Sequence, residues 1–183
     1  MPVKTFKDYL GVVKLPLLIF FVVALLNLTL GMARFIPTIG ILISPLLWGI
    51  GVLIGSIVGF VLACWLGWRV VRNYFGTIEQ AAVAGVLYGF LTGVINIIFA
   101  LVNTIAQFLL TWITAGVVLG AAHFAGQAYS PIEAGFLALL ESIFGTALVF
   151  IGVVLAVVLL PIEIITGVIG ALIGGALAGG TKK

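Results

Sequence analysis

Charged side chains are scarce in this sequence. Of its 183 residues only 7% are charged, with eight Lys and Arg and five Asp and Glu, whereas 64% are hydrophobic. A soluble globular domain is about a quarter charged, and no polar stretch here is long enough to form a folded domain of its own. The composition therefore excludes a soluble protein and predicts a chain that lies within a lipid bilayer.

The residue types that build most catalytic and metal sites are equally few. The sequence has one cysteine, Cys64, one histidine, His123, and one aspartate, Asp8. A single cysteine excludes an internal disulfide, and an isolated histidine and cysteine do not make a zinc or haem site. No nucleophile stands near a base, and no glycine-rich phosphate loop precedes a lysine. We expect no enzymatic activity and no cofactor, and the scattered basic residues do not predict nucleic-acid binding.

Long apolar runs fill the chain, and several exceed the roughly 18 residues needed to span a bilayer. The first follows Lys4, Lys7 and Lys14 and ends in a small-residue pattern, Gly31-Met32-Ala33, typical of a signal sequence. We expect this segment to be retained as a signal-anchor helix. A joint at Asn103-Thr104 and a break at Pro161 separate later runs. We expect six transmembrane helices, at about 15–33, 45–68, 79–102, 105–127, 131–160 and 164–180.

The basic residues predict an orientation, because Lys and Arg are enriched in cytoplasmic loops. If the N-terminus is cytoplasmic, seven of the eight Lys and Arg fall on that side and only Arg34 falls outside. Glu163 is then expected at the outer surface, where it could pair with Arg34. An even number of crossings places both termini in the cytoplasm. We expect an integral, multi-pass protein of a prokaryotic cell membrane.

Two stretches 86 positions apart resemble each other. Ser44–Leu62 reads SPLLWGIGVLIGSIVGFVL, Ser130–Leu148 reads SPIEAGFLALLESIFGTAL, and eight of nineteen positions match. Composition alone would give roughly two matches, so we favour a duplicated unit over coincidence in low-complexity sequence. Within a single membrane domain, 1–183, the predicted repeats are 15–102 and 103–183. Each repeat would contain three spans, so the second repeat would enter the membrane from the side opposite to the first. This predicts an all-α bundle with an inverted 3+3 repeat.

Glycines recur at intervals of four, which places them on one helix face. Small residues at this spacing let membrane helices approach closely. We expect packing faces of this glycine-zipper kind, and Gly55 and Gly89 are predicted to cross near the middle of the bilayer. A sliding or pore-lining interface is the less favoured interpretation. The residues are Gly51, Gly55, Gly59, Gly85, Gly89, Gly93, Gly175 and Gly179.

Glu141 is the first candidate for chemistry. It matches Gly55 in the repeat, which would place it roughly 15 Å into the bilayer. An ionisable group at that depth indicates function, typically proton or cation coupling. The alternative is that the fifth span begins later, which would leave Glu141 at the headgroup level. Both interpretations remain open from the sequence.

Polar residues at helical spacing form further candidates. Tyr88, Thr92 and Asn96 share one face of the third span, and Ser56 and Ser142 are equivalent in the repeat. These could line a path for a small polar solute, or serve as hydrogen-bonding contacts between helices. A proton relay is conceivable from His123, Gln127 and Glu133, although a lone histidine is more often inert.

The leading functional hypothesis is a transporter or channel for a small solute or ion. It depends on the inverted repeat and the carboxylate of Glu141. The alternative is a non-catalytic accessory or scaffold subunit of a larger membrane complex, which packs through its glycine-rich faces. The expected partners are the lipid bilayer and either further copies of the chain or other membrane subunits.

Overall fold

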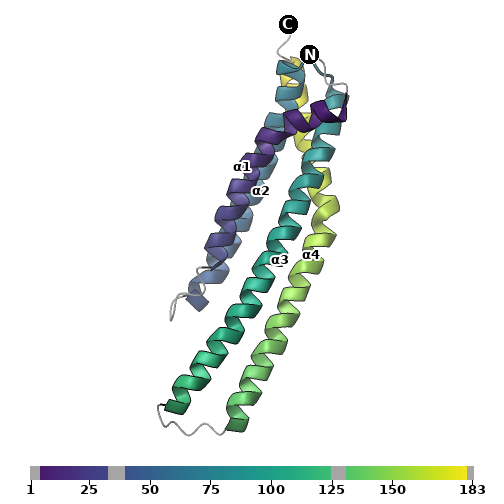
Figure 1. The fold of residues 1–183 in the computed structure, drawn as a ribbon. Helices are drawn as coiled ribbons and strands as arrows, with labels where there is room; N and C mark the ends of the chain where they lie inside the picture. The colour runs from purple at the N-terminus through teal and green to yellow at the C-terminus, as the bar shows by residue number, and fades with distance from the viewer. Residues whose placement is uncertain (1–4, 33–39, 125–130, 181–183) are drawn as a thin grey trace. The chain divides into compact units, whose positions relative to one another are not determined.

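The computed structural model describes the backbone of residues 5–32, 40–124 and 131–180, with side chains mainly over 5–29, 50–106 and 153–179. Within these ranges the chain forms four α-helices (Figure 1): α1 (Phe6–Met32), α2 (Gly40–Asn73), α3 (Ile78–Phe124) and α4 (Pro131–Gly180). Each contains an apolar stretch long enough to cross a membrane, at Phe6–Thr29, Leu53–Asn73, Ile78–Ala106 and Val153–Gly179. The expected class, an all-α multi-pass membrane protein, is confirmed.

Two helices begin with reciprocal side-chain caps. At α1, the Thr5 backbone N–H donates to Asp8 Oδ2 at 2.9 Å, and the Asp8 N–H donates to Thr5 Oγ1 at 3.4 Å. At α3, the Thr77 N–H donates to Gln80 Oε1 at 3.0 Å, and the Gln80 N–H donates to Thr77 Oγ1 at 3.2 Å. Each capping box satisfies backbone donors that have no partner inside the helix, which explains where α1 and α3 start.

The turn between α2 and α3 carries a strained residue. The Gly76 N–H donates to the Val70 carbonyl at 3.0 Å, which satisfies a carbonyl of the last turn of α2, and the residue before Gly76 is in a left-handed position. Phe75 occupies that left-handed position with φ of 53°, and its side chain is 72% exposed. Glycine is the usual residue here, because a bulky side chain at positive φ is disfavoured.

Proline inside α1 does not end the helix. Pro16 is fully buried and lacks the N–H that would bond to the Val12 carbonyl one turn earlier. Helices bend at such positions, and α1 bends near its beginning (Figure 1).

The predicted helix ends at Asn103-Thr104 and Pro161 are wrong. The helix of α3 runs through Asn103 and Thr104, and Pro161 lies inside α4. Asn and Thr lower helix propensity by less than about 1 kcal/mol each, too little to stop an apolar helix. Proline removes one backbone hydrogen bond and bends a membrane helix without ending it.

The chain divides into two compact units. The first comprises residues up to Phe99 and from Val157 onward, and the second comprises Ala100–Ala156. These borders differ from the predicted halves 15–102 and 103–183, because the last part of α4 packs with the first three helices. The second unit contains the remaining parts of α3 and α4, which run antiparallel (Figure 1). The duplication itself stays a prediction.

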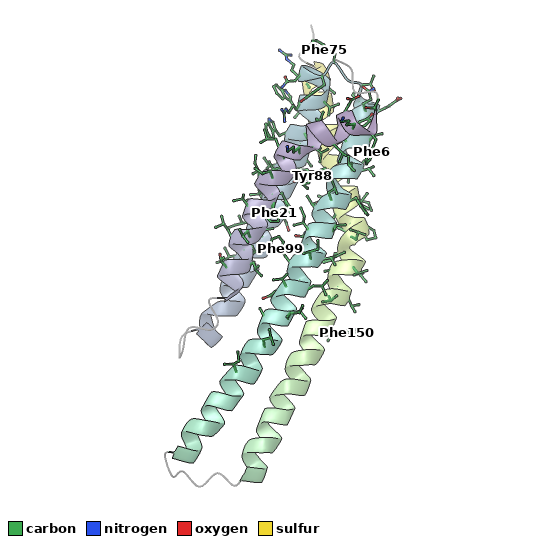
Figure 2. The ribbon with its side chains drawn as sticks, in the orientation of Figure 1. Phe6, Phe21, Phe75, Tyr88, Phe99 and Phe150 are labelled. Atoms are coloured by element: carbon green, nitrogen blue, oxygen red, sulfur yellow. The ribbon has the colours of Figure 1, made fainter. Side chains whose placement is uncertain are left out.

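The core of the first unit is formed by side chains from all four helices. The α1 and α2 helices pack along each other, and the ring of Phe20 on α1 meets the ring of Tyr88 on α3 edge to face, with centroids 6.4 Å apart. The start of α1 and the end of α2, marked by Phe6 and Phe75, lie at one end of this unit (Figure 2); we call it the Phe75 end. The buried apolar residues include Val12, Val13, Leu62, Ala63, Leu66, Val70, Ala81, Ala84, Ala171 and Ala178.

Large apolar side chains cover the outside of the first unit. On α2, Leu53 is 63% exposed, and Ile57 and Val61 are similarly exposed. Lipid tails are as apolar as these side chains, so such a surface is expected of helices that face a bilayer.

Candidate functional site

In the first unit α3 and α4 approach each other through glycine. A Cβ atom built on Gly85 would lie 2.5 Å from the Gly167 carbonyl oxygen, and one built on Gly89 would lie 2.5 Å from the Glu163 carbonyl oxygen. On Gly93 it would meet the side chain of Leu160. The two backbones are therefore in direct contact, an approach that residues with a side chain would prevent.

The predicted crossing of Gly55 with Gly89 is wrong. Gly89 packs on Glu163 and Ile164 of α4, while a Cβ on Gly55 would meet no described atom within 4 Å. The prediction compared depths in the bilayer, and depth does not determine which helices are neighbours.

The other predicted glycines have mixed surroundings. Gly51 faces the side chain of Asn27, Gly59 lies against the ring of Phe20, and Gly175 lies against Ala81 and Val71. A Cβ on Gly179, like one on Gly55, would meet no described atom within 4 Å. For these two positions a packing role stays a prediction.

Sequence reasoning missed the contact of α2 with α4. Gly67 faces the backbone of Ala171, and Gly174 faces the backbone of Cys64. A Cβ on Gly170 would lie 2.7 Å from that of Ala63. The signal was present, since Gly167, Gly170 and Gly174 recur at helical intervals of three and four, which marks a packing face.

A carboxylate lies beside the glycine crossing. The Asn96 side-chain amide on α3 donates a hydrogen bond of 3.0 Å to Oε1 of Glu163 on α4. Both residues lie inside apolar stretches that are long enough to cross a membrane. The helix of α4 does not end at Pro161, so Glu163 lies within the apolar stretch Val153–Gly179. Its predicted position at the outer surface stays a prediction. The expected partner, Arg34, lies outside the described residues.

The predicted polar stripe of α3 faces the interior of the first unit. Tyr88 and Thr92 are each only 2% exposed, and Asn96 is half-buried. The Thr92 hydroxyl donates to the Gly89 carbonyl at 3.0 Å, and the Tyr88 hydroxyl donates to the Gly59 carbonyl at 3.3 Å. Tyr88 thereby joins α3 to α2, and Asn96 joins α3 to α4.

The carboxylate of Glu163 would be energetically unfavourable in the hydrocarbon core of a bilayer. An acidic side chain in the middle of a membrane helix costs about 2.5–3.5 kcal/mol on insertion scales, and a hydrogen bond between membrane helices returns on average only about 0.6 kcal/mol. The hydrogen bond from the Asn96 amide therefore orients the carboxylate but does not offset the free-energy cost of placing it in the bilayer. A group retained despite this cost can accept a proton or bind a cation within the bilayer.

The remaining predicted residues divide between the units. Ser56 is exposed on α2 in the first unit. Positions 123, 133, 141 and 142 lie on α3 and α4 in the second unit, but the side chains of His123, Glu133, Glu141 and Ser142 are outside the described part of the chain. Gln127 lies outside it altogether. The burial of Glu141 and the proton relay therefore stay predictions.

Metal ligands do not gather in the described ranges, where no group of three or more His, Cys, Asp or Glu side chains could hold an ion. No protein family, curated protein or solved structure matches this sequence. Function is therefore inferred from the chemistry of the Glu163–Asn96 pair and its surroundings.

Proposed function

We propose that this protein moves a small solute or ion across the membrane, with Glu163 as its ionisable group. The observation that carries the proposal is the hydrogen bond from Asn96 to Glu163, inside two apolar membrane-crossing stretches. Carboxylates at such positions typically belong to proton or cation pathways. Tyr88, Thr92 and Asn96 supply polar groups on the same face of α3.

In the proposed mechanism, Glu163 alternates between a bound and a free state. Its carboxylate takes up a proton or cation, while the Asn96 amide keeps the group in position. The glycine contacts at Gly85, Gly89 and Gly167 lack side chains that would interlock, so α3 and α4 can shift slightly against each other as the charge changes. Ser56 is proposed as a further polar position in the first unit. In the second unit the proposed polar positions are Ser142 and Glu141, with His123, Gln127 and Glu133 as a relay.

We further propose that the chain crosses the bilayer six times as an inverted repeat, with both termini in the cytoplasm. The α3 and α4 helices have 47 and 50 residues, which corresponds to about 70 and 75 Å at 1.5 Å per residue. The hydrocarbon core is only about 30 Å thick, and the stretch 107–152 is too apolar to extend into water. Six crossings would require α3 and α4, each one continuous helix in the structure, to be interrupted in the bilayer.

Ion flux into liposomes tests the transport proposal. The purified protein is reconstituted, and movement of H⁺, Na⁺ and K⁺ is followed with ion-sensitive dyes. Glu163→Gln should abolish the flux, since the amide cannot take up a proton or balance a cation. Glu79→Gln, which changes an exposed carboxylate in the first turn of α3, should leave it unchanged. Equal flux through folded Glu163→Gln and wild-type protein would remove Glu163 from the mechanism.

The accessory-subunit alternative is favoured by one observation. Gly55 on α2 and Gly179 on α4 meet no described atom within 4 Å, so both positions leave room for a helix of another subunit. Purification in mild detergent separates the two functions. A stoichiometric membrane partner, together with no ion flux by the chain alone, would favour the accessory role over transport.

A further inference from the structure

The guanidinium group of Arg69 lies among aromatic rings at the Phe75 end of the first unit. Its central carbon is 5.5 Å from the centroid of the Trp65 ring and 5.7 Å from that of the Tyr74 ring. Both distances allow cation–π attraction, which orients the planar group. Arg69 is thus held in place without an acidic partner among the described residues.

One donor of this guanidinium is unsatisfied. The nitrogen Nη1 is buried and has no hydrogen-bond partner within the described part of the chain. A buried donor left without an acceptor is unfavourable, more so when the group is charged. Because protein atoms cover Nη1, an external acceptor can reach it only if neighbouring side chains move.

The surroundings of Arg69 have the character of a membrane–water interface. Arg72 lies one turn further along α2, and the exposed Lys7 lies near the start of α1. Exposed aromatic side chains accompany them, with Trp68 38% and Phe75 72% exposed. Basic and aromatic residues together are typical of the headgroup level of a bilayer.

The acidic groups at this end do not neutralise Arg69. Asp8 accepts hydrogen bonds from Thr5 at the start of α1, and Glu79 is exposed in the first turn of α3. Neither forms an ion pair with Arg69 in the described structure, so the positive charge remains available to an external anion.

We propose that Arg69 binds a phosphate group at the Phe75 end, as presented by the headgroup of an anionic phospholipid. The fork of guanidinium donors matches two phosphate oxygens, and one oxygen would reach Nη1 once the neighbouring side chains shift. A lipid phosphate is anchored at the interface, where Trp65, Trp68 and Phe75 contact the acyl chains and glycerol region. Basic sites between membrane helices bind anionic headgroups in this way. This site is independent of the proposed transport path.

Lipid retention by the full-length protein tests the proposal. Protein is taken from bilayers of phosphatidylcholine mixed with phosphatidylglycerol, and bound lipid is counted by native mass spectrometry. Wild-type protein should retain phosphatidylglycerol, and Arg69→Gln should bind it about tenfold more weakly, equivalent to about 1.4 kcal/mol. Arg69→Lys should be intermediate, because lysine keeps the charge without the fork. Lys7→Gln is the matched control for non-specific electrostatic attraction between a basic side chain and anionic lipid. It should weaken phosphatidylglycerol binding by no more than about fivefold.

A competition arm identifies the source of the phosphate. Displacement of phosphatidylglycerol by inorganic phosphate would assign the site to a soluble phosphate, and resistance to displacement would assign it to a lipid. Equal losses in Arg69→Gln and Lys7→Gln, or equal retention by Arg69→Gln and wild-type protein, would overturn the site. If Arg69→Gln does not fold, the Arg69→Lys variant serves as the test. Phosphatidylglycerol binding by Arg69→Lys as strong as that of wild-type protein would contradict recognition by the guanidinium fork.

Discussion

The side-chain amide of Asn96 donates a 3.0 Å hydrogen bond to the carboxylate of Glu163, which lies 67 residues later in the chain. On α3 the bond lies two turns beyond the contact of Gly89 with the Glu163 backbone. Glycine brings the two helices close enough for a short amide to reach the carboxylate. The pair therefore depends on the glycine crossing, and both can be tested by substitution.

Replacing Asn96 with Leu should destabilise the protein by about 1–3 kcal/mol, because it leaves a half-buried carboxylate without its donor. The double variant Asn96→Leu/Glu163→Leu should be less destabilised than this, since no charge remains inside the helices. The free energy of unfolding in mixed detergent micelles, followed by circular dichroism, measures both. Thr166→Val is the control, because within the described ranges that hydroxyl bonds to the Ile162 carbonyl of its own helix. A loss no greater in Asn96→Leu than in Thr166→Val would contradict a structural role for the bond.

Two substitutions of Tyr88 should separate the contributions of its hydroxyl and its ring to the free energy of unfolding. Tyr88→Phe removes the hydrogen bond to the Gly59 carbonyl and should lower the unfolding free energy by about 0.5–1.5 kcal/mol. Tyr88→Ala also removes the ring packed against Phe20 and should lower it by about 3–5 kcal/mol. Unfolding in micelles gives both values. Equal losses in the two variants would mean that the ring contributes nothing.

Alanine at two glycines should have opposite effects. Gly89→Ala places a methyl group against the backbone of Glu163 and Ile164, and such overpacking costs about 1–3 kcal/mol. Gly55→Ala meets no described atom and should be neutral or stabilising by up to about 1 kcal/mol through helix propensity. Thermal unfolding of both variants in detergent is the measurement. Strong destabilisation by Gly55→Ala would instead indicate that another subunit covers this position.

Composition was sufficient to predict the class of fold, because so few charged residues leave no alternative to a bilayer. The capping boxes at Thr5 and Thr77 are also legible in the sequence, since each depends on residues three positions apart. Helix ends inside apolar runs were not predictable in the same way. Asn103 and Pro161 can end a helix in water, but in a nonpolar environment an unpaired backbone is costlier than a bent helix.

The polar stripe of α3 was predictable from its spacing, but its partner was not. Periodicity places Tyr88, Thr92 and Asn96 on one face, whereas the residue opposite depends on which helix packs there and at which height. Because a helix end was predicted at Pro161, Glu163 was expected at the surface and Glu141 was the only carboxylate considered inside the bilayer. A helix continued through Pro161 would have made Glu163 a second candidate inside an apolar stretch.

Phe75→Gly should stabilise the protein by about 1–3 kcal/mol. Phe75 is held at φ of 53°, which is strained for a residue with a Cβ atom and free of strain for glycine. Phe75→Ala is the matched control, because it removes the ring but keeps the Cβ and should not give the same gain. Unfolding in micelles gives both values. Equal stability of the Gly and Ala variants would show that the effect comes from the exposed ring and not from the backbone.

The number of membrane crossings can be decided by labelling two cysteines. In a Cys64→Ala background, Glu79→Cys marks the start of α3 and Gln127→Cys marks the segment between α3 and α4. With six crossings both positions face the cytoplasm, because α3 contributes two crossings between them. With four crossings, α3 passes through the bilayer once and the two positions face opposite sides. A membrane-impermeant maleimide applied to right-side-out and inverted vesicles distinguishes these results, and the Cys64→Ala parent without added cysteine is the blank. Labelling of the two positions from opposite sides would contradict the six-span proposal. In that case about 40 Å of each long helix, calculated from the rise per residue, would extend beyond the hydrocarbon core and would have to pack against another apolar partner.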